Sequence, residues 1–225
     1  MARPGIRRAM TTVLYVHGLE SGPRGNKART LEAAGFTVVS AQMPCNRAAT
    51  LRAPAFLFMV LAALGLLGAL TWAGGALGFV IGIVAVLVLR RFARPLLVRN
   101  MVRRCVDVQL SMLKQHAVDV VVGSSFGGAI TLELLALGAW KGRTLLLCPA
   151  QRLVAQRSGS PETALPDDAS HVVVVHGRQD ETVPFEHSHA LVRGSAAKLI
   201  EVDDQHRLSN TATAENFERW IALTA

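Results

Sequence analysis

A serine between glycines is the first place in this sequence where chemistry is expected. The stretch GSSFGG sets Ser125 in the pattern Gly123-x-Ser125-x-Gly127, after a valine-rich run and before a run with helical spacing. Glycines on either side allow a sharp, strained strand-to-helix turn that presents the serine hydroxyl to a substrate. Because the short pattern also arises by chance, the strand before it and the helix after it carry the prediction that Ser125 is a nucleophile.

A serine hydroxyl becomes a good nucleophile only when a neighbouring base takes its proton. A histidine oriented by a carboxylate does this, and one known chain order is serine, acid, histidine. Asp180 and His206 follow Ser125 in that order, and each comes after a predicted strand. Asp203 and Asp204 are rival acids, but they adjoin His206 in the sequence and are expected to cap a loop.

The tetrahedral intermediate of such a reaction needs two N–H groups that bind its oxyanion. One is expected from the residue after the nucleophile and one from the loop after an early strand. These positions are Phe126 and Leu19, the latter within YVHGLESG. We expect His17 and Gly18 to support that loop, with the His17 ring bracing it in preference to transferring a proton.

All of these residues lie at the ends of predicted strands. Apolar, β-branched runs alternate along the chain with segments of helical spacing; the runs are TTVLYV, FTVVSA, VDVVVGS, RTLLL, HVVVVHG and AKLIEV. This alternation predicts an α/β fold, a mostly parallel sheet with helices on both faces, whose chemistry collects beyond the carboxyl ends of the strands. The stretch 151–170 is rich in turn residues and is expected to be a surface loop.

Five stretches carry a family resemblance: LYVHGLESGPRGNKA, VVVGSSFGGA, LLLCPA, VVVVHGRQDETVP and DDQHRLSN. Together they resemble the α/β-hydrolases, and specifically the small, cap-poor group of bacterial YqiA-type esterases. The resemblance implies that Ser125, Asp180 and His206 form a catalytic triad and that the amides of Leu19 and Phe126 form the oxyanion hole. It does not fix the substrate, because this fold hosts many acyl-transfer reactions.

An inserted apolar segment interrupts this pattern. Residues 53–89 carry no charge, and as one helix they would be about 55 Å long, more than the ~30 Å of a bilayer's hydrocarbon core. Since the strands before and after must pair in one sheet, the chain has to return to the side that it left, which excludes a single crossing. We therefore predict hydrolase parts at 1–46 and 105–225, with an inserted apolar helical hairpin and its arginine-rich flanks at 47–104.

The hairpin is predicted to consist of arms at 54–71 and 75–89 that turn near TWAGG. It could cross the membrane twice, dip into one leaflet, or serve a soluble esterase as a lid or dimer interface. Small residues recur every four positions, at Gly74, Gly78 and Gly82. Such a face permits close helix packing within the hairpin or between protomers of a homo-oligomer, although apolar segments are often glycine-rich in any case.

Charge and cysteine content limit the partners and cofactors. The net charge of +8 comes from eight arginines around the apolar segment, and the rest of the chain balances. Arginines beside an apolar stretch are typical of lipid headgroup binding, and no motif for nucleic-acid binding accompanies them. Three scattered cysteines and the remaining histidines lack metal-ligand spacing, so no metal or cofactor is expected. The N-terminus lacks the apolar core of a signal peptide.

These observations favour a serine hydrolase anchored in the inner membrane of a bacterium, with its catalytic part in the cytoplasm. Its expected substrate is an ester or thioester in an acyl-lipid, an acyl-protein or a small molecule. The competing hypothesis is a non-catalytic hydrolase-like scaffold whose hairpins assemble in the membrane.

Overall fold

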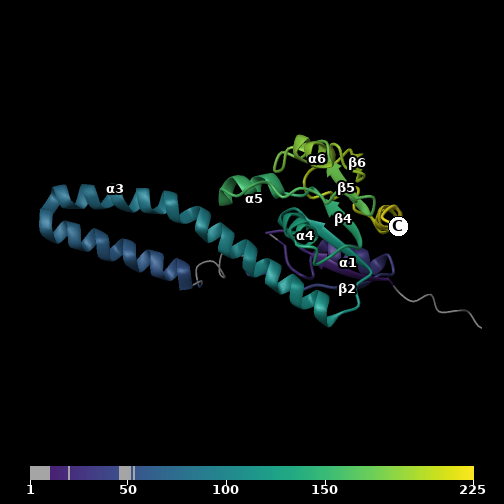
Figure 1. Ribbon diagram of the computed structural model, residues 1–225, viewed down its shortest axis with the longest axis horizontal. Coiled ribbons are helices and arrows are strands. Elements are labelled where there is room, and N and C mark those ends of the chain that lie inside the picture. The colour runs from purple at the N-terminus through teal and green to yellow at the C-terminus, as the bar shows by residue number, and fades with distance from the viewer. Residues whose placement is uncertain (1–10, 20, 46–51, 53) are drawn as a thin grey trace, which may run out of the picture.

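The computed structural model describes residues 11–19, 21–45, 52 and 54–225. In this part of the chain, six strands form a single sheet in the order β2-β1-β3-β4-β5-β6 (Figure 1). They are β1 (Thr12–Val16), β2 (Thr37–Val39), β3 (Val120–Ser124), β4 (Arg143–Leu147), β5 (Val172–Gly177) and β6 (Lys198–Val202). Every neighbouring pair is parallel, which confirms the predicted fold class.

Helices cover both faces of this sheet. They are α1 (Asn26–Ala33), α3 (Pro54–Gln115), α4 (Phe126–Ala136), α5 (Gln151–Ser158), α6 (Phe185–Val192) and α7 (Ala214–Ala222). The central strands β3 and β5 are buried along their whole length, as their runs of valine require in a sheet covered on both sides. On one face their side chains pack with α1 and α7. On the other face β3 packs with α4 and the end of α3, and β5 packs with α4 and α6.

Helix α5 corrects one prediction. The stretch 151–170 is not a loop throughout, because its first eight residues form α5, which ends at Gly159 in a left-handed conformation. This helix is short and mostly polar, so its sequence resembles a loop. Packing against α3 and α4 stabilises it, and that packing is invisible to local pattern.

The apolar segment forms a helical hairpin. The 62 residues of α3 are interrupted at Gly75, whose φ of 56° and ψ of −134° reverse the chain near the predicted turn. Figure 1 shows the two arms side by side, projecting beyond the sheet domain. A Cβ atom at Gly78 would lie 1.9 Å from the carbonyl oxygen of Leu70, and one at Gly82 would lie 3.4 Å from the Cα of Leu67. The small face of the second arm therefore packs against the first arm.

The hairpin exposes large apolar side chains around its surface. Trp72 beside the turn is 92% exposed and Phe58 75%, and only 11% of the most apolar stretch is buried. By length and composition, α3 is able to cross a membrane. The second arm runs without a break past 104 to Gln115, so the expected 104/105 boundary falls inside one helix. The expected 46/47 boundary and the flanking Arg47 lie outside the described residues.

Candidate active site

Ser125 occupies a strained turn between β3 and α4. Its φ of 56° and ψ of −117° lie in a region that residues with a side chain rarely adopt. Two bonds hold the turn: the Ser125 N–H donates to the carbonyl of Leu147 at 2.8 Å, and the Ser125 carbonyl accepts from the N–H of Ala150 at 3.1 Å. Both partners belong to the end of β4 and the loop after it, so the neighbouring strand fixes the conformation of this serine.

The glycines around Ser125 allow this turn to pack closely. A Cβ atom at Gly127 would lie 2.0 Å from the carbonyl oxygen of Val16, so only glycine lets α4 begin this close to β1. At Gly123 a Cβ would lie 2.4 Å from the Thr131 hydroxyl oxygen. A Cβ at Gly18 would lie 3.4 Å from the Cβ of Ser125, so the loop after β1 directly adjoins the serine.

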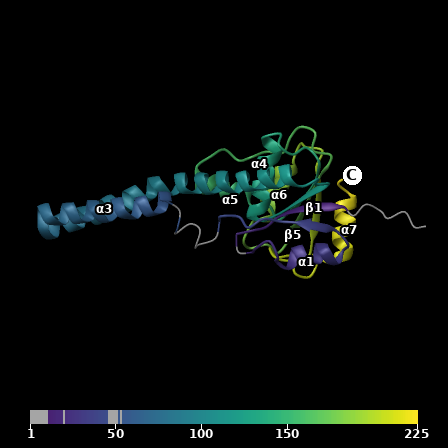
Figure 2. The same cartoon turned by 90° about the horizontal axis from the view of Figure 1, so that it is seen from below.

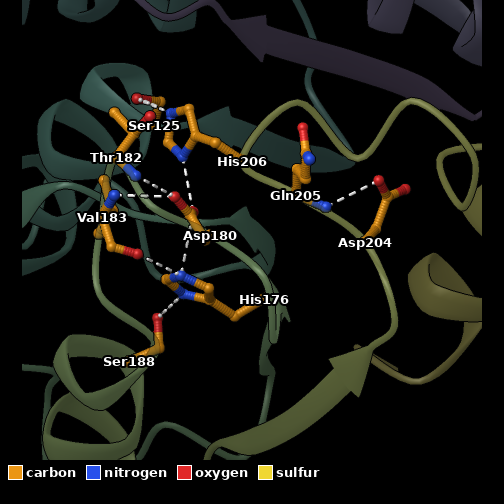
Figure 3. A network of polar contacts seen from close by, with 9 residues as sticks. All are labelled: Ser125, His176, Asp180, Thr182, Val183, Ser188, Asp204, Gln205 and His206. Carbon is orange, nitrogen blue, oxygen red and sulfur yellow. Dashed lines mark hydrogen bonds and ion pairs between the residues drawn. The ribbon is translucent and has the colours of Figure 1, made fainter.

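The structure brings Ser125, His206 and Asp180 into one line of hydrogen bonds (Figure 3). The Ser125 hydroxyl lies 2.9 Å from Nε2 of His206, and Nδ1 of that ring lies 2.6 Å from Oδ2 of Asp180. A carboxylate accepts only, so Nδ1 donates its proton to Asp180 and Nε2 is left to accept the serine proton. Three strand-end loops, far apart in the sequence, supply these groups.

Asp180 is buried and is held as an anion by its surroundings. Burial alone raises the pKa of this carboxyl group, but hydrogen bonds outweigh it and bring the pKa well below the usual range. The donors are His176, His206 and the N–H of Val183; Oδ1 also accepts from the N–H of Thr182 at 2.9 Å. An ionised Asp180 can orient the His206 ring and stabilise a positive charge on it.

His176 supports Asp180 from below, a role that the sequence did not indicate. Its ring is fully buried, and Nε2 lies 2.9 Å from the carbonyl oxygen of Val183 and 3.1 Å from Oδ2 of Asp180. Its Nδ1 accepts from the Ser188 hydroxyl at 2.6 Å. The one available signal was its place four residues before Asp180, in the strand that ends three residues before the acid.

The rival acids, Asp203 and Asp204, do not bond the His206 ring in the hydrogen bonds of the described residues. Asp204 accepts hydrogen bonds from the N–H groups of Gln205, Asn210 and Thr211, so it caps the loop that carries His206 (Figure 3 shows the Gln205 bond). Asp203 is paired at the surface with the side-chain amide of Gln179.

The expected oxyanion donors are the backbone amides of Leu19 and Phe126, and Gly18, the residue before Leu19, adjoins Ser125. No backbone hydrogen bond between described residues uses the N–H of Leu19 or of Phe126. His17 is buried behind the Leu19 loop: its Nδ1 donates to the carbonyl of Gly18 at 2.8 Å, and its Nε2 accepts from the N–H of Met43 at 3.2 Å. Burial lowers the pKa of His17, so its ring is a neutral link between the loop after β1 and the loop after β2.

Cys148 is a neighbour of the site that the sequence analysis did not connect with it. Its sulfur, an Asp180 oxygen and a His206 nitrogen all lie within 4.8 Å of one another, a spacing that could hold a metal ion. Burial raises the pKa of Cys148, which disfavours the thiolate that a metal requires. Asp180 and His206 are already bonded to each other. This donor set therefore fits a hydrogen-bonded site better than a metal centre.

Comparison with known proteins gives the fold but no closer relative. No family model matches the chain, and no curated protein matches it. Among solved structures, a protein of Xanthomonas campestris pv. campestris classed as a hydrolase of the alpha/beta superfamily is 20% identical, with a TM-score of 0.56 and 95% of each chain covered. The mouse alpha/beta hydrolase domain-containing protein 10 is 14% identical, with a TM-score of 0.54, 94% of this chain and 86% of that chain covered.

The chain has the α/β-hydrolase fold. In α/β-hydrolases the nucleophile sits on the strand-to-helix turn and the order along the chain is serine, acid, histidine. Ser125, Asp180 and His206 occupy those positions here. The narrower resemblance to YqiA-type esterases stays a prediction.

Proposed function

We propose that this protein is a membrane-anchored serine hydrolase that cleaves an ester or thioester. The observation that carries the proposal is the line of hydrogen bonds from the Ser125 hydroxyl through His206 to the buried Asp180. A structural role does not require serine, histidine and aspartate from three separate loops in this geometry. It also does not require the nucleophile to adopt a strained backbone conformation.

In the first half of the proposed reaction, the Ser125 oxygen attacks the carbonyl carbon while Nε2 of His206 takes the hydroxyl proton. Asp180 stabilises the imidazolium that forms. The amides of Leu19 and Phe126 donate hydrogen bonds to the developing oxyanion, each typically contributing about 10²- to 10³-fold to the rate. His206 then returns its proton to the leaving oxygen or sulfur, and an acyl-serine remains.

In the second half, a water molecule attacks the acyl-serine as His206 takes one of its protons. Collapse of the second tetrahedral intermediate releases the carboxylic acid and gives the proton back to the Ser125 oxygen. Overall, one ester and one water become one acid and one alcohol, or a thiol when the substrate is a thioester. This sequence requires neither a metal nor a redox cofactor.

The hairpin supports the membrane anchor. Its first arm, 54–74, is about 31 Å long at 1.5 Å per residue, which matches the ~30 Å hydrocarbon core. The sequence alone suggested shorter arms, whereas the second helix continues past Pro95 and lies opposite the start of the first. Exposed Trp72 at the turn is a residue type that favours the membrane interface. The hairpin projects beyond the sheet domain and does not fold back over it, which favours an anchor over a lid (Figure 2).

The test is to label the membrane fraction of cells that express the protein with a fluorophosphonate probe and to assay p-nitrophenyl esters of short and long chains. We expect labelling and turnover in the wild type, and a loss of about 10⁴-fold or more in Ser125→Ala. Ser111→Ala, on the exposed surface of α3, is the matched control. A folded wild type that is neither labelled nor active would refute the enzyme and favour a scaffold.

A further inference from the structure

The carboxyl edge of the sheet, where the candidate active site lies, faces the hairpin. Helix α3 arrives from the hairpin and ends at Gln115 on the opposite side of the domain. Asp119 follows and pairs with Thr12, so β1 and β3 both begin there. All the strands are parallel and run back toward the hairpin. Figures 1 and 2 agree with this arrangement.

Contacts with α3 show which residues of this helix lie beside the carboxyl edge of the sheet. Phe126, the residue after the serine, belongs to the apolar cluster that includes Met101 and Val102 of α3. The guanidinium of Arg99 donates to the carbonyls of Ser158 and Gly159, each at 2.8 Å, at the end of α5. Cys105 and Val106 of α3 are buried members of the same cluster, so the edge lies beside residues 101–106 of the helix.

The apolar surface of the hairpin ends just short of this level. Leu96, 63% exposed, is the last large apolar side chain of the second arm that is so exposed, and it lies opposite the start of the first arm. From Leu96 to residues 101–106 the helix rises about 8 to 15 Å. The polar headgroup layer of one leaflet is about 5 to 7 Å thick. With the hairpin in a bilayer up to Leu96, the carboxyl edge is thus held within about 10 Å of the headgroup surface.

The surroundings of the edge suit such a surface. Exposed arginines lie on α3 on both sides of Leu96: Arg90, Arg91 and Arg94 come before it, and Arg99, Arg103 and Arg104 come after it. Cations at this position are attracted to anionic lipid headgroups. Leu19, which follows Gly18 in the loop that adjoins Ser125, is 37% exposed, so this loop presents an apolar side chain at the surface.

We infer that the substrate is an acyl ester of a lipid in the same membrane, drawn from the leaflet that borders the domain. The inference rests on the proposed function and specifies its substrate. Ser125 would attack the ester carbonyl, and one water would complete the reaction, so that one acyl lipid becomes one fatty acid and one deacylated lipid. A lipid ester needs to rise only about 8 to 15 Å, because the anchor fixes the distance between site and bilayer.

Lengthening helix α3 between the hairpin and the sheet domain tests the inferred lipid substrate directly. Seven helix-forming residues inserted between Leu97 and Val98 lift the domain by about 10.5 Å and leave its rotation nearly unchanged. A Gly/Ser segment added between Cys45 and Pro54 lets the first arm keep its level. The chain with the Gly/Ser segment alone is the matched control. Each full-length protein is reconstituted in vesicles of equal parts phosphatidylethanolamine and phosphatidylglycerol that carry a fluorogenic phosphatidylglycerol, and p-nitrophenyl butyrate is assayed in parallel.

We expect the wild type and the control to hydrolyse the vesicle lipid. The rate of the lifted variant should be lower by about a hundredfold or more. Each methylene of the acyl chain that is drawn into water lowers roughly fourfold the fraction of lipid molecules whose ester can reach Ser125. The p-nitrophenyl butyrate rate of the lifted variant should be unchanged. A lifted variant that keeps the wild-type ratio of the two rates would overturn the inference. So would a wild type that cleaves only the soluble ester, which would leave the proposed function standing. Failure with both substrates and with the fluorophosphonate would instead refute the proposed function.

Discussion

Replacing Gly127 by alanine should lower the catalytic rate strongly while the sheet still folds. The added Cβ would meet the Val16 carbonyl oxygen at 2.0 Å and the His17 carbonyl oxygen at 2.6 Å, both backbone atoms of β1 and the loop after it. Ordinary contact begins at 3.4 Å, so the start of α4 has to move by about 1.4 Å. This movement carries Ser125 and the Phe126 amide away from the Leu19 amide.

A misplacement of about 1 Å can lower the rate of an enzyme by about 10²-fold. We therefore expect kcat/KM for p-nitrophenyl butyrate to fall at least that far in Gly127→Ala. Overpacking should lower the free energy of unfolding by about 1 to 3 kcal/mol, so the protein stays folded. Active-site titration with the fluorophosphonate and thermal unfolding followed by circular dichroism measure the two effects.

Gly68→Ala is the matched control, because a Cβ at this hairpin position meets nothing within 4 Å. It should keep wild-type activity. The reasoning would be refuted if Gly127→Ala unfolded at the wild-type temperature and kept wild-type kcat/KM, since the close approach of α4 to β1 would then have no bearing on the site.

Three further predictions use other contacts. Asp180→Asn should lower kcat by about 10⁴-fold by removing the anion that orients His206. Because the pKa of Asp180 lies below its ordinary 3.8, the ionised carboxylate stabilises the fold above pH 3.8, and this stabilisation is lost as the pH falls further. The free energy of unfolding should therefore decrease less with acid in Asp180→Asn than in the wild type. An identical pH dependence in both proteins would contradict the assignment of a lowered pKa to Asp180. Paired cysteines in Leu67→Cys with Gly82→Cys should cross-link under mild oxidation, and adding Gly78→Leu should prevent this by forcing the arms apart; cross-linking that persists would show that the arms pack differently. Cys148 should resist iodoacetamide in the folded protein and react in denaturant, as peptide mass spectrometry can establish, and rapid labelling of the native protein would contradict its burial.

The sheet and the position of the serine were predictable because their signals are local. Runs of valine mark strands that are covered on both faces, and a glycine two residues either side of Ser125 marks a turn that only small neighbours permit. The turn of the hairpin was similarly marked by the pair Gly74 and Gly75.

Other features depended on packing between distant segments and left no local signal. The role of His176 depends on how its ring turns inside the core, and Cys148 approaches Asp180 only after β4 and β5 pair. Helix α5 is too polar and too short to be recognised without its neighbours. The unbroken course of the second arm of α3, from the turn to Gln115, was hidden by its change from an apolar to an arginine-rich composition.

The strand order also determines at what stage of synthesis the sheet can form. β1 and β2 emerge from the ribosome first, but β1 lies between β2 and β3, and β3 follows the whole hairpin in the chain. The two early strands alone cannot bury their apolar surface. They can pair with β3, the strand that precedes the serine, only after about eighty further residues have been synthesised. In the proposed anchored hydrolase, synthesis thus delivers the hairpin to the bilayer before Ser125 is made, so that a new chain would acquire its proposed activity only at the membrane surface.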